Sequence, residues 1–229
     1  MKSRSLPWRA FVQFGLAIVA TVLFVELAKY VIAGDADAFD KSVALAIHRI
    51  DPPNMPLLDW IMIGFTSIGS GIGLILAVAA TVVWLVKNHH RRTALILTCN
   101  ALAAQGLNVA LKHYVQRPRP TLFDEITRPE TFSFPSGHSL SAMAIFGGIA
   151  AVLVTLYPHR RARIVCAAVL LIATIGFSRV YLGVHWPLDV LAGFAAGVPL
   201  LVATIHLLHT KNGLKITRRD DKVNVYSPA

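Results

Sequence analysis

Six long apolar runs are the feature that most limits what this chain can fold into. Each is long enough to cross a lipid bilayer, which takes about 20 helical residues. Because the bilayer core offers no water to pair with, backbone polar groups there must be paired within helices or closed barrels. The runs lie at about 10–33, 57–86, 93–115, 136–157, 164–181 and 188–208. The sequence therefore predicts an all-α fold, a bundle of six transmembrane helices in a single domain over residues 1–229.

The charge pattern agrees with a membrane protein and predicts its orientation. Charged residues make up only 15% of the chain, against about 25% in soluble globular chains. The net charge of +10 does not indicate nucleic acid, because the basic residues form clusters beside the apolar runs and no single stripe. Such clusters are typical of cytoplasmic loops. They lie at Lys2–Arg9, Lys87–Arg92, Arg160–Arg163 and Lys211–Lys222. Both termini, with the basic tail 210–229, are predicted to be cytoplasmic, and segments 34–56 and 116–135 to lie outside.

Three smaller features give further expectations. Between the first two runs, Phe39–Ile50 places its apolar residues on one helical face, which predicts a short interfacial helix on the membrane surface. Glu26 and Lys29 are three residues apart and could pair on one face of the first helix, although the sequence does not give their role. Cys99 and Cys166 lie inside apolar runs and are expected to be buried free thiols.

Three polar segments fall on the same predicted outer face of the membrane. They are Lys112–Pro120 at the end of the third run, Pro135–His138 before the fourth, and Ser178–Asp189 between the fifth and the sixth. Ions are costly at membrane depth, so grouped cations beside histidines at helix ends indicate a functional site.

The cations of these segments suit a phosphoryl group. Lys112, Arg119 and Arg179 could surround it and neutralise the charge spread over its oxygens. Arginine is well suited to this because its planar fork forms bidentate bonds with phosphate. Ser136 and Gly137 would add N–H groups and a hydroxyl at the start of a helix, where anions bind.

The two histidines could supply the reactive groups. Asp189 follows His185 by four residues where a helix begins, with Pro187 at a favoured first-turn position. The carboxylate could therefore accept the proton of one ring nitrogen of His185 and leave the other free to attack phosphorus. His138 would then protonate the leaving oxygen.

Each of these residues has a simpler interpretation when taken alone. The cations could bind lipid headgroups, and the histidines could be interfacial residues with satisfied hydrogen bonds. Asp189 could be an ordinary first-turn residue that opposes the helix dipole. Their joint occurrence on one predicted face favours the catalytic interpretation.

The three segments resemble the signature of the type 2 phosphatidic acid phosphatase superfamily: Lys-x6-Arg-Pro, Pro-Ser-Gly-His, and Ser-Arg-x5-His-x3-Asp. All three are complete within residues 112–189, whereas the part before residue 112 agrees only in general layout. The resemblance implies a metal-independent enzyme without a cofactor. His185 would form a phosphohistidine, Asp189 would orient it, and His138 would act as general acid and base. The phosphate would be bound by Lys112, Arg119, Ser136, Gly137 and Arg179.

The resulting hypothesis is a multi-pass phosphatase of the cytoplasmic (inner) membrane that acts on a lipid phosphate or diphosphate at the extracytoplasmic face. Undecaprenyl diphosphate, phosphatidylglycerophosphate and phosphatidate all remain open as substrates. A lipid phosphotransferase remains open as well, as does a non-catalytic lipid-phosphate binder or transporter. The sequence does not set the oligomeric state.

Overall fold

The computed structural model describes residues 6–48, 56–122 and 131–210, and within these ranges every regular element is helical. The prediction of an all-α fold is confirmed. In chain order the helices are α1 (Leu6–Ile32), α2 (Asp37–His48), α3 (Pro56–Ile68), α4 (Gly71–Lys87), α5 (Arg91–Val115), α6 (Gly137–Leu156), α7 (Arg161–Tyr181) and α8 (Pro187–His209). A short 3-10 turn, Pro158–Arg160, leads into α7.

Five of the described helices are long and apolar enough to cross a membrane: α1, α5, α6, α7 with its preceding turn, and α8. The predicted helix over 57–86 is instead divided into α3 and α4, which meet at an angle of 56°. Counted as one bent span, this pair brings the number to six. The count of six spans therefore stays a prediction.

The division between α3 and α4 has a local cause in the sequence Gly69-Ser70. Ser70 starts α4 as its N-cap, since its Oγ accepts a hydrogen bond of 3.3 Å from the N–H of Gly73. Gly73 lies so close to the end of α3 that a Cβ there would be 2.4 Å from the carbonyl oxygen of Ser67. Only glycine, which has no Cβ, allows the first turn of α4 to lie this close to the end of α3. The axis of α3 therefore turns away from that of α4.

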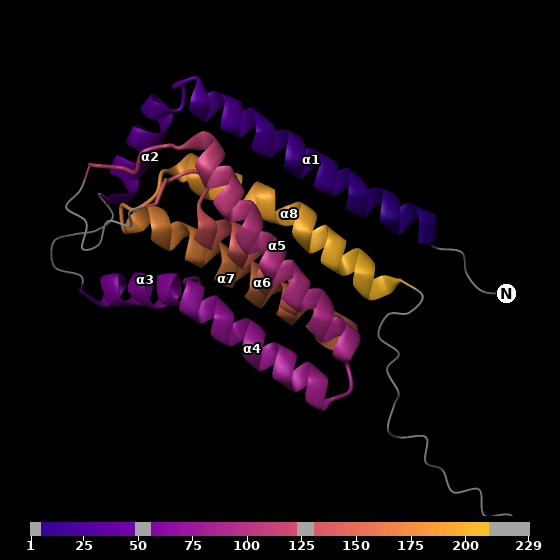
Figure 1. Cartoon of the computed structure of the whole chain (residues 1–229). Coiled ribbons are helices and arrows are strands. Elements are labelled where there is room, and N and C mark those ends of the chain that lie inside the picture. The colour runs from indigo at the N-terminus through magenta and orange to yellow at the C-terminus, as the bar shows by residue number, and fades with distance from the viewer. Residues whose placement is uncertain (1–5, 49–55, 123–130, 211–229) are drawn as a thin grey trace, which may run out of the picture.

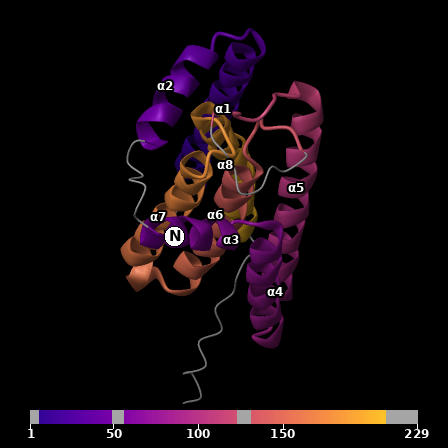
Figure 2. The ribbon, with the colours of Figure 1, turned by 90° about the vertical axis from the view of Figure 1, so that its left-hand side faces the viewer.

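The centre of the bundle is α6, which packs against α5, α7 and α8. In Figure 1, α1 lies along α8 on one side of the bundle and α4 follows α5 on the other. Figure 2 looks onto one end, where α2 and α1 lie above the central helices and α3 crosses in front of them. Half of the most apolar stretch of α6 is buried, against 6% of that of α1. The first helix therefore turns most of its surface away from the rest of the bundle.

Two of the smaller expectations have clear outcomes on the helix surfaces. Glu26 and Lys29 do pair, with 2.7 Å between the carboxylate and the ammonium, and both side chains are largely exposed. Cys99 and Cys166 are free thiols as expected, but both are exposed. The prediction that they are buried is wrong, because the apolar runs that hold them turn part of their surface away from the bundle.

The segment between the first two spans forms α2, close to the helix predicted over Phe39–Ile50. Asp40 and Ala44 are buried on its inner face, while Phe39 and Leu45 are exposed on the other side. The pattern of one inward and one outward face follows from the helical period. The location of α2 on the membrane surface stays a prediction, and residues 49–50 lie outside the described residues.

Substitution of Gly193 in α8 tests the close approach of α8 to the start of α6. A Cβ at Gly193 would lie 2.6 Å from the carbonyl oxygen of Ser136, so Gly193→Ala should lower the free energy of unfolding by about 1–3 kcal/mol. Gly106→Ala in α5 is the matched control, because nothing lies within 4 Å of its Cβ position. Thermal unfolding in detergent measures both. Equal melting temperatures for the two variants would contradict the close approach.

Candidate active site

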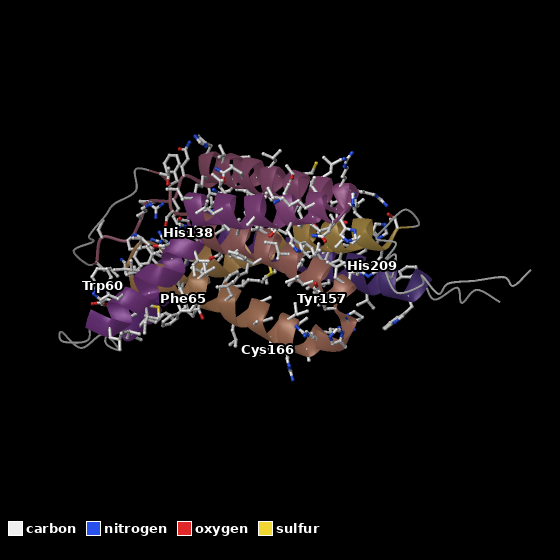
Figure 3. The ribbon with its side chains drawn as sticks, turned by 90° about the horizontal axis from the view of Figure 1, so that it is seen from below. Trp60, Phe65, His138, Tyr157, Cys166 and His209 are labelled. Carbon is white, nitrogen blue, oxygen red and sulfur yellow. The ribbon has the colours of Figure 1, made fainter. Side chains whose placement is uncertain are left out.

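The three polar segments of the sequence meet at one end of the bundle, where α5 and α7 end and α6 and α8 begin. This is the left-hand end in Figure 1. His138 lies at this end with Trp60 and Phe65 of α3, and Tyr157 and His209 lie toward the opposite end (Figure 3). All eight predicted site residues thus come from segments that the fold gathers in one place.

His185 is the most enclosed of the reactive side chains, with 2% of its surface exposed in the turn between α7 and α8. Its Nε2 lies 3.3 Å from Nη1 of Arg119, and its Nδ1 lies 3.4 Å from Oδ2 of Asp189. A guanidinium can only donate, so Nε2 is the nitrogen that accepts and carries the lone pair. The proton of the ring is therefore assigned to Nδ1, facing Asp189.

Burial also sets the charge of this ring. It lowers the pKa of His185 to about 3, although the hydrogen bond and the charge of Asp189 act in the opposite direction. The ring is therefore neutral at ordinary pH, with one lone pair directed toward Arg119. A neutral imidazole with an unprotonated nitrogen beside a phosphate-binding cation and an oriented proton is the arrangement of an activated nucleophile.

Asp189 is fully buried in the first turn of α8 and is held by several donors. Its Oδ2 accepts the backbone N–H of Trp186 at 3.0 Å and the hydroxyl of Ser133. Its Oδ1 accepts Nη1 of Arg117 at 2.8 Å. These contacts satisfy a carboxylate that would otherwise be costly to bury. They also fix its orientation toward His185.

Arg117, Asp40 and Ser133 are residues of this site that sequence reasoning missed. Nη2 of Arg117 lies 2.7 Å from Oδ2 of Asp40, and Oδ1 of Asp40 accepts the N–H of Leu188 at 2.9 Å. Burial raises the pKa of Asp40, while the N–H of Leu188 and the guanidinium of Arg117 oppose that rise. The only sequence signals were an acidic connector and a second Arg-Pro pair beside Arg119-Pro120.

The predicted cations line the same end of the bundle from two helices and one linker. Lys112, in the last turn of α5, donates to the carbonyl oxygens of Phe132 and Ser133. Nη1 of Arg119 donates to the carbonyl oxygen of Val184 at 2.6 Å. The cations are thus fixed by backbone carbonyls, which leaves the linker and the turn before α8 held in place.

Arg179, in the last turn of α7, is buried and donates to the hydroxyl of Thr66 in α3. Nearby, the hydroxyl of Tyr181 donates to Asp59 of α3 at 2.8 Å. These two contacts join α3 to the end of α7 beside the site. The bend between α3 and α4 therefore brings α3 to the predicted phosphate-binding residues.

The start of α6 is fastened directly to the start of α8. The N–H of Ser136 donates to the carbonyl oxygen of Asp189 at 2.9 Å. The hydroxyl of Ser136 caps α6 by accepting the N–H of Ser139 at 3.4 Å. Gly137 lies against Asn108 of α5, since a Cβ at Gly137 would be 2.8 Å from its amide nitrogen. The helix start that was predicted to receive an anion is therefore well anchored.

His138 follows in the first turn of α6 and is partly exposed. The His138 ring interacts electrostatically with four groups of the site: Arg179, His185, Arg119 and Lys112. On another side its ring lies near the α3–α4 break, since a Cβ at Gly69 would be 3.2 Å from its Cδ2. The site thus combines one enclosed histidine, one more open histidine and three cations, a set suited to transfer of a phosphoryl group.

Comparison with known proteins points in the same direction. The family model of the PAP2 superfamily matches residues 92–213. Phosphatidylglycerophosphatase B of Bacillus subtilis is 31% identical over 188 residues, which are 78% of this chain and 88% of that protein. Undecaprenyl-diphosphatase of Sulfolobus acidocaldarius is 31% identical over 125 residues, 52% of this chain and 57% of that protein.

A solved structure is similar over most of the fold. The crystal structure of a transmembrane PAP2-type phosphatidylglycerolphosphate phosphatase from Bacillus subtilis matches with a TM-score of 0.77 and 27% sequence identity. The match covers 82% of this chain and 93% of that one.

Ser133→Ala tests how strongly the hydroxyl supports Asp189. A hydrogen bond to a charged group contributes about 1.5–3 kcal/mol, so this variant should lose that much unfolding free energy in detergent. Ser42→Ala is the control, because that exposed hydroxyl donates within its own helix, to the carbonyl oxygen of Phe39 at 2.8 Å. An unchanged melting temperature of Ser133→Ala would show that the other donors suffice for Asp189.

Proposed function

This chain belongs to the PAP2 superfamily, and we propose that it is a membrane-bound lipid phosphatase that works through a phosphohistidine intermediate. The observation that carries the proposal is the geometry of His185. One ring nitrogen lies 3.4 Å from the Asp189 carboxylate and the other 3.3 Å from the Arg119 guanidinium. A neutral ring between a carboxylate and a phosphate-binding cation is prepared for attack on phosphorus.

In the first step, Nε2 of His185 attacks phosphorus and the bond from phosphorus to the lipid oxygen breaks. The ring becomes a phosphorylated imidazolium, and Asp189 stabilises its charge through the Nδ1 proton. His138 donates a proton to the leaving lipid oxygen. The lipid product is then an alcohol, or a lipid monophosphate when the substrate is a diphosphate.

In the second step, water attacks the phosphohistidine and the bond between phosphorus and Nε2 breaks. His138, now deprotonated, accepts the proton of this water, as microscopic reversibility requires. Inorganic phosphate leaves and His185 returns to its neutral form. One residue thus serves as general acid in the first step and as general base in the second.

The phosphate oxygens are bound by Lys112, Arg119 and Arg179, together with the N–H groups and the hydroxyl at Ser136-Gly137. These cations supply the positive charge that many other phosphatases take from a metal. In the described part of the chain, no group of three or more His, Cys, Asp or Glu side chains converges on one point. The proposal therefore includes activity without a metal ion.

The same proposal places the site at the extracytoplasmic face of the cytoplasmic membrane. The links that carry the basic clusters Lys87–Arg92 and Arg160–Arg163 lie at the end of the bundle opposite the site (Figure 1). Basic loops stay on the cytoplasmic side. The first turn of α1 and the end of α8 also lie at that basic end, which agrees with two cytoplasmic termini.

Among the candidate substrates, phosphatidylglycerophosphate is placed first and undecaprenyl diphosphate second. The support is the name of the relative whose match extends over 78% of this chain, against 52% for the undecaprenyl-diphosphatase. Phosphatidate is kept as a third candidate. All three present a terminal phosphoryl group that the cations could bind, so headgroup and chain contacts must decide among them.

A phosphate-release panel over these three lipids, with purified protein in detergent, tests the function. His185→Ala should lower kcat by about 10³-fold or more, because the covalent step is lost. His209→Ala at the opposite end of the bundle is the matched control and should keep the rate of the unaltered protein. Phosphate found on a second lipid would instead indicate a phosphotransferase. Lipid binding without any turnover, unchanged in His185→Ala, would indicate a binding protein.

Chelation tests the proposed independence of metal. Excess EDTA should leave phosphate release unchanged within about twofold, because Lys112, Arg119 and Arg179 neutralise the phosphate without a metal. The rate is measured with and without added Mg²⁺ after dialysis against the chelator. Activity that disappears in EDTA and returns with Mg²⁺ would contradict this part of the proposal.

A further inference from the structure

Two carboxylates that are far apart in the sequence share one guanidinium beside the candidate nucleophile. Arg117 lies 2.7 Å from Asp40 and 2.8 Å from Asp189, through different nitrogens. Arg117 is 7% exposed, and both carboxylates have no exposed surface. Asp40 comes from α2, Arg117 from the linker after α5, and Asp189 from α8. Three segments therefore converge on one buried set of charges.

Both carboxylates also bind the start of α8, immediately after His185. Asp189 accepts the N–H of Trp186 at 3.0 Å, and Asp40 accepts the N–H of Leu188 at 2.9 Å. These N–H groups have no partner within the helix, and carboxylates at this end are favoured by the helix dipole. Arg117 is further fixed by the indole of Trp186, 5.4 Å from its guanidinium carbon. Asp40 thus contacts the guanidinium that holds Asp189 and, through Leu188, the backbone of the same helix start.

Stability alone does not account for a charge at position 40. A buried ion pair contributes little to folding compared with apolar residues of similar volume, because desolvation offsets the attraction. The neighbours of Asp40 on the inner face of this segment, Ala36 and Ala44, are small and buried. An apolar side chain at position 40 would satisfy packing. It would leave the positive charge of Arg117 opposed mainly by Asp189.

We propose that Asp40 is a positioning residue for catalysis that acts on Asp189 through Arg117. By offsetting the charge of Arg117, Asp40 leaves the negative charge of Asp189 available to the His185 ring, which becomes cationic when it is phosphorylated. It also holds Arg117 in the orientation that fixes the Asp189 carboxylate. This inference rests on the proposed phosphohistidine mechanism and assigns a role in that reaction to the helix α2.

The role of Asp40 should appear in kcat and not in KM. Its described contacts are with Arg117 and the N–H of Leu188, and none is with Lys112, Arg119 or Arg179. Substrate phosphate should therefore bind as before, while formation of the phosphohistidine slows. A residue that only supported the fold would change the amount of folded protein and its melting temperature, without a selective effect on turnover.

Asp40→Asn is the central variant, because it keeps the shape and the acceptor oxygen for Leu188 and replaces the charged oxygen that faces Arg117 with a neutral amide NH2. We expect kcat to fall about 10- to 100-fold with KM within about threefold of the unaltered protein. Asp37→Asn is a matched control on the same helix: its carboxylate lies 3.7 Å from the same guanidinium, but 64% of the side chain is exposed. Its kcat should change by less than about twofold, because exposed ion pairs are weak.

A double-mutant cycle then tests whether Asp40 acts through Arg117. In an Arg117→Met background, the further change Asp40→Asn should alter kcat by less than about twofold. Independent multiplication of the two effects would overturn the proposed route. Asp40→Glu, which keeps the charge, should retain more activity than Asp40→Asn. An equal loss in both would mean that the fit of the side chain matters and not its charge, which would also overturn the proposal.

The unaltered protein and His185→Ala, measured in the same assay, separate this inference from the proposed function. Normal turnover by a folded Asp40→Asn variant, beside an inactive His185→Ala variant, would overturn the role of Asp40 and leave the phosphatase intact. An effect confined to KM would overturn it as well. Failure of the unaltered protein to release phosphate from every lipid of the panel would reject the phosphatase, and with it the role of Asp40.

Discussion

The burial of the Asp189 carboxylate is the constraint on which the site-bearing end of the bundle depends. A carboxylate without contact with water needs donors, and here they come from three places: the linker before α6, the segment after α5 and the turn before α8. These hydrogen bonds to Asp189 bring together the ends of helices that are distant in the sequence. The same contacts fix the carboxylate that orients His185. The hydrogen bonds that stabilise the buried charge of Asp189 therefore also position the candidate nucleophile.

Much of this could be predicted from the sequence because the relevant signals are local. Apolar runs of membrane length predicted the all-α fold, and the short motifs from Lys112 to Asp189 predicted which residues meet. The break between α3 and α4 was missed. Small residues such as Gly69 and Ser70 also occur inside unbroken membrane helices, where they allow close packing against neighbouring helices. Asp40 was missed for another reason. Its partner lies 77 residues away, and nothing local distinguishes it from the other aspartates of its connector.

Two of the relatives carry names for different lipid phosphates. The shorter of the two matches covers only 52% of this chain. The motif residues lie on α5, α6, α7, α8 and their links, whereas α2 and α3 come from the part before residue 112. In this chain both of these helices nevertheless contact the site, α2 through Asp40 and α3 through the contact of Thr66 with Arg179. The motif residues and the helices that precede them in the sequence are therefore physically joined.

The alternating direction of the helices has an electrostatic consequence for the cations. At the site, α5 and α7 present their C-terminal ends, which carry partial negative charge, and Lys112 and Arg179 lie in their last turns. The helices α6 and α8 present their positive N-terminal ends there, and Asp189 lies in the first turn of α8. Each charged side chain is thus stabilised by the backbone of its own helix. The free energy needed to hold these like charges close together is supplied once, when the chain folds. It is not needed again each time a lipid molecule binds.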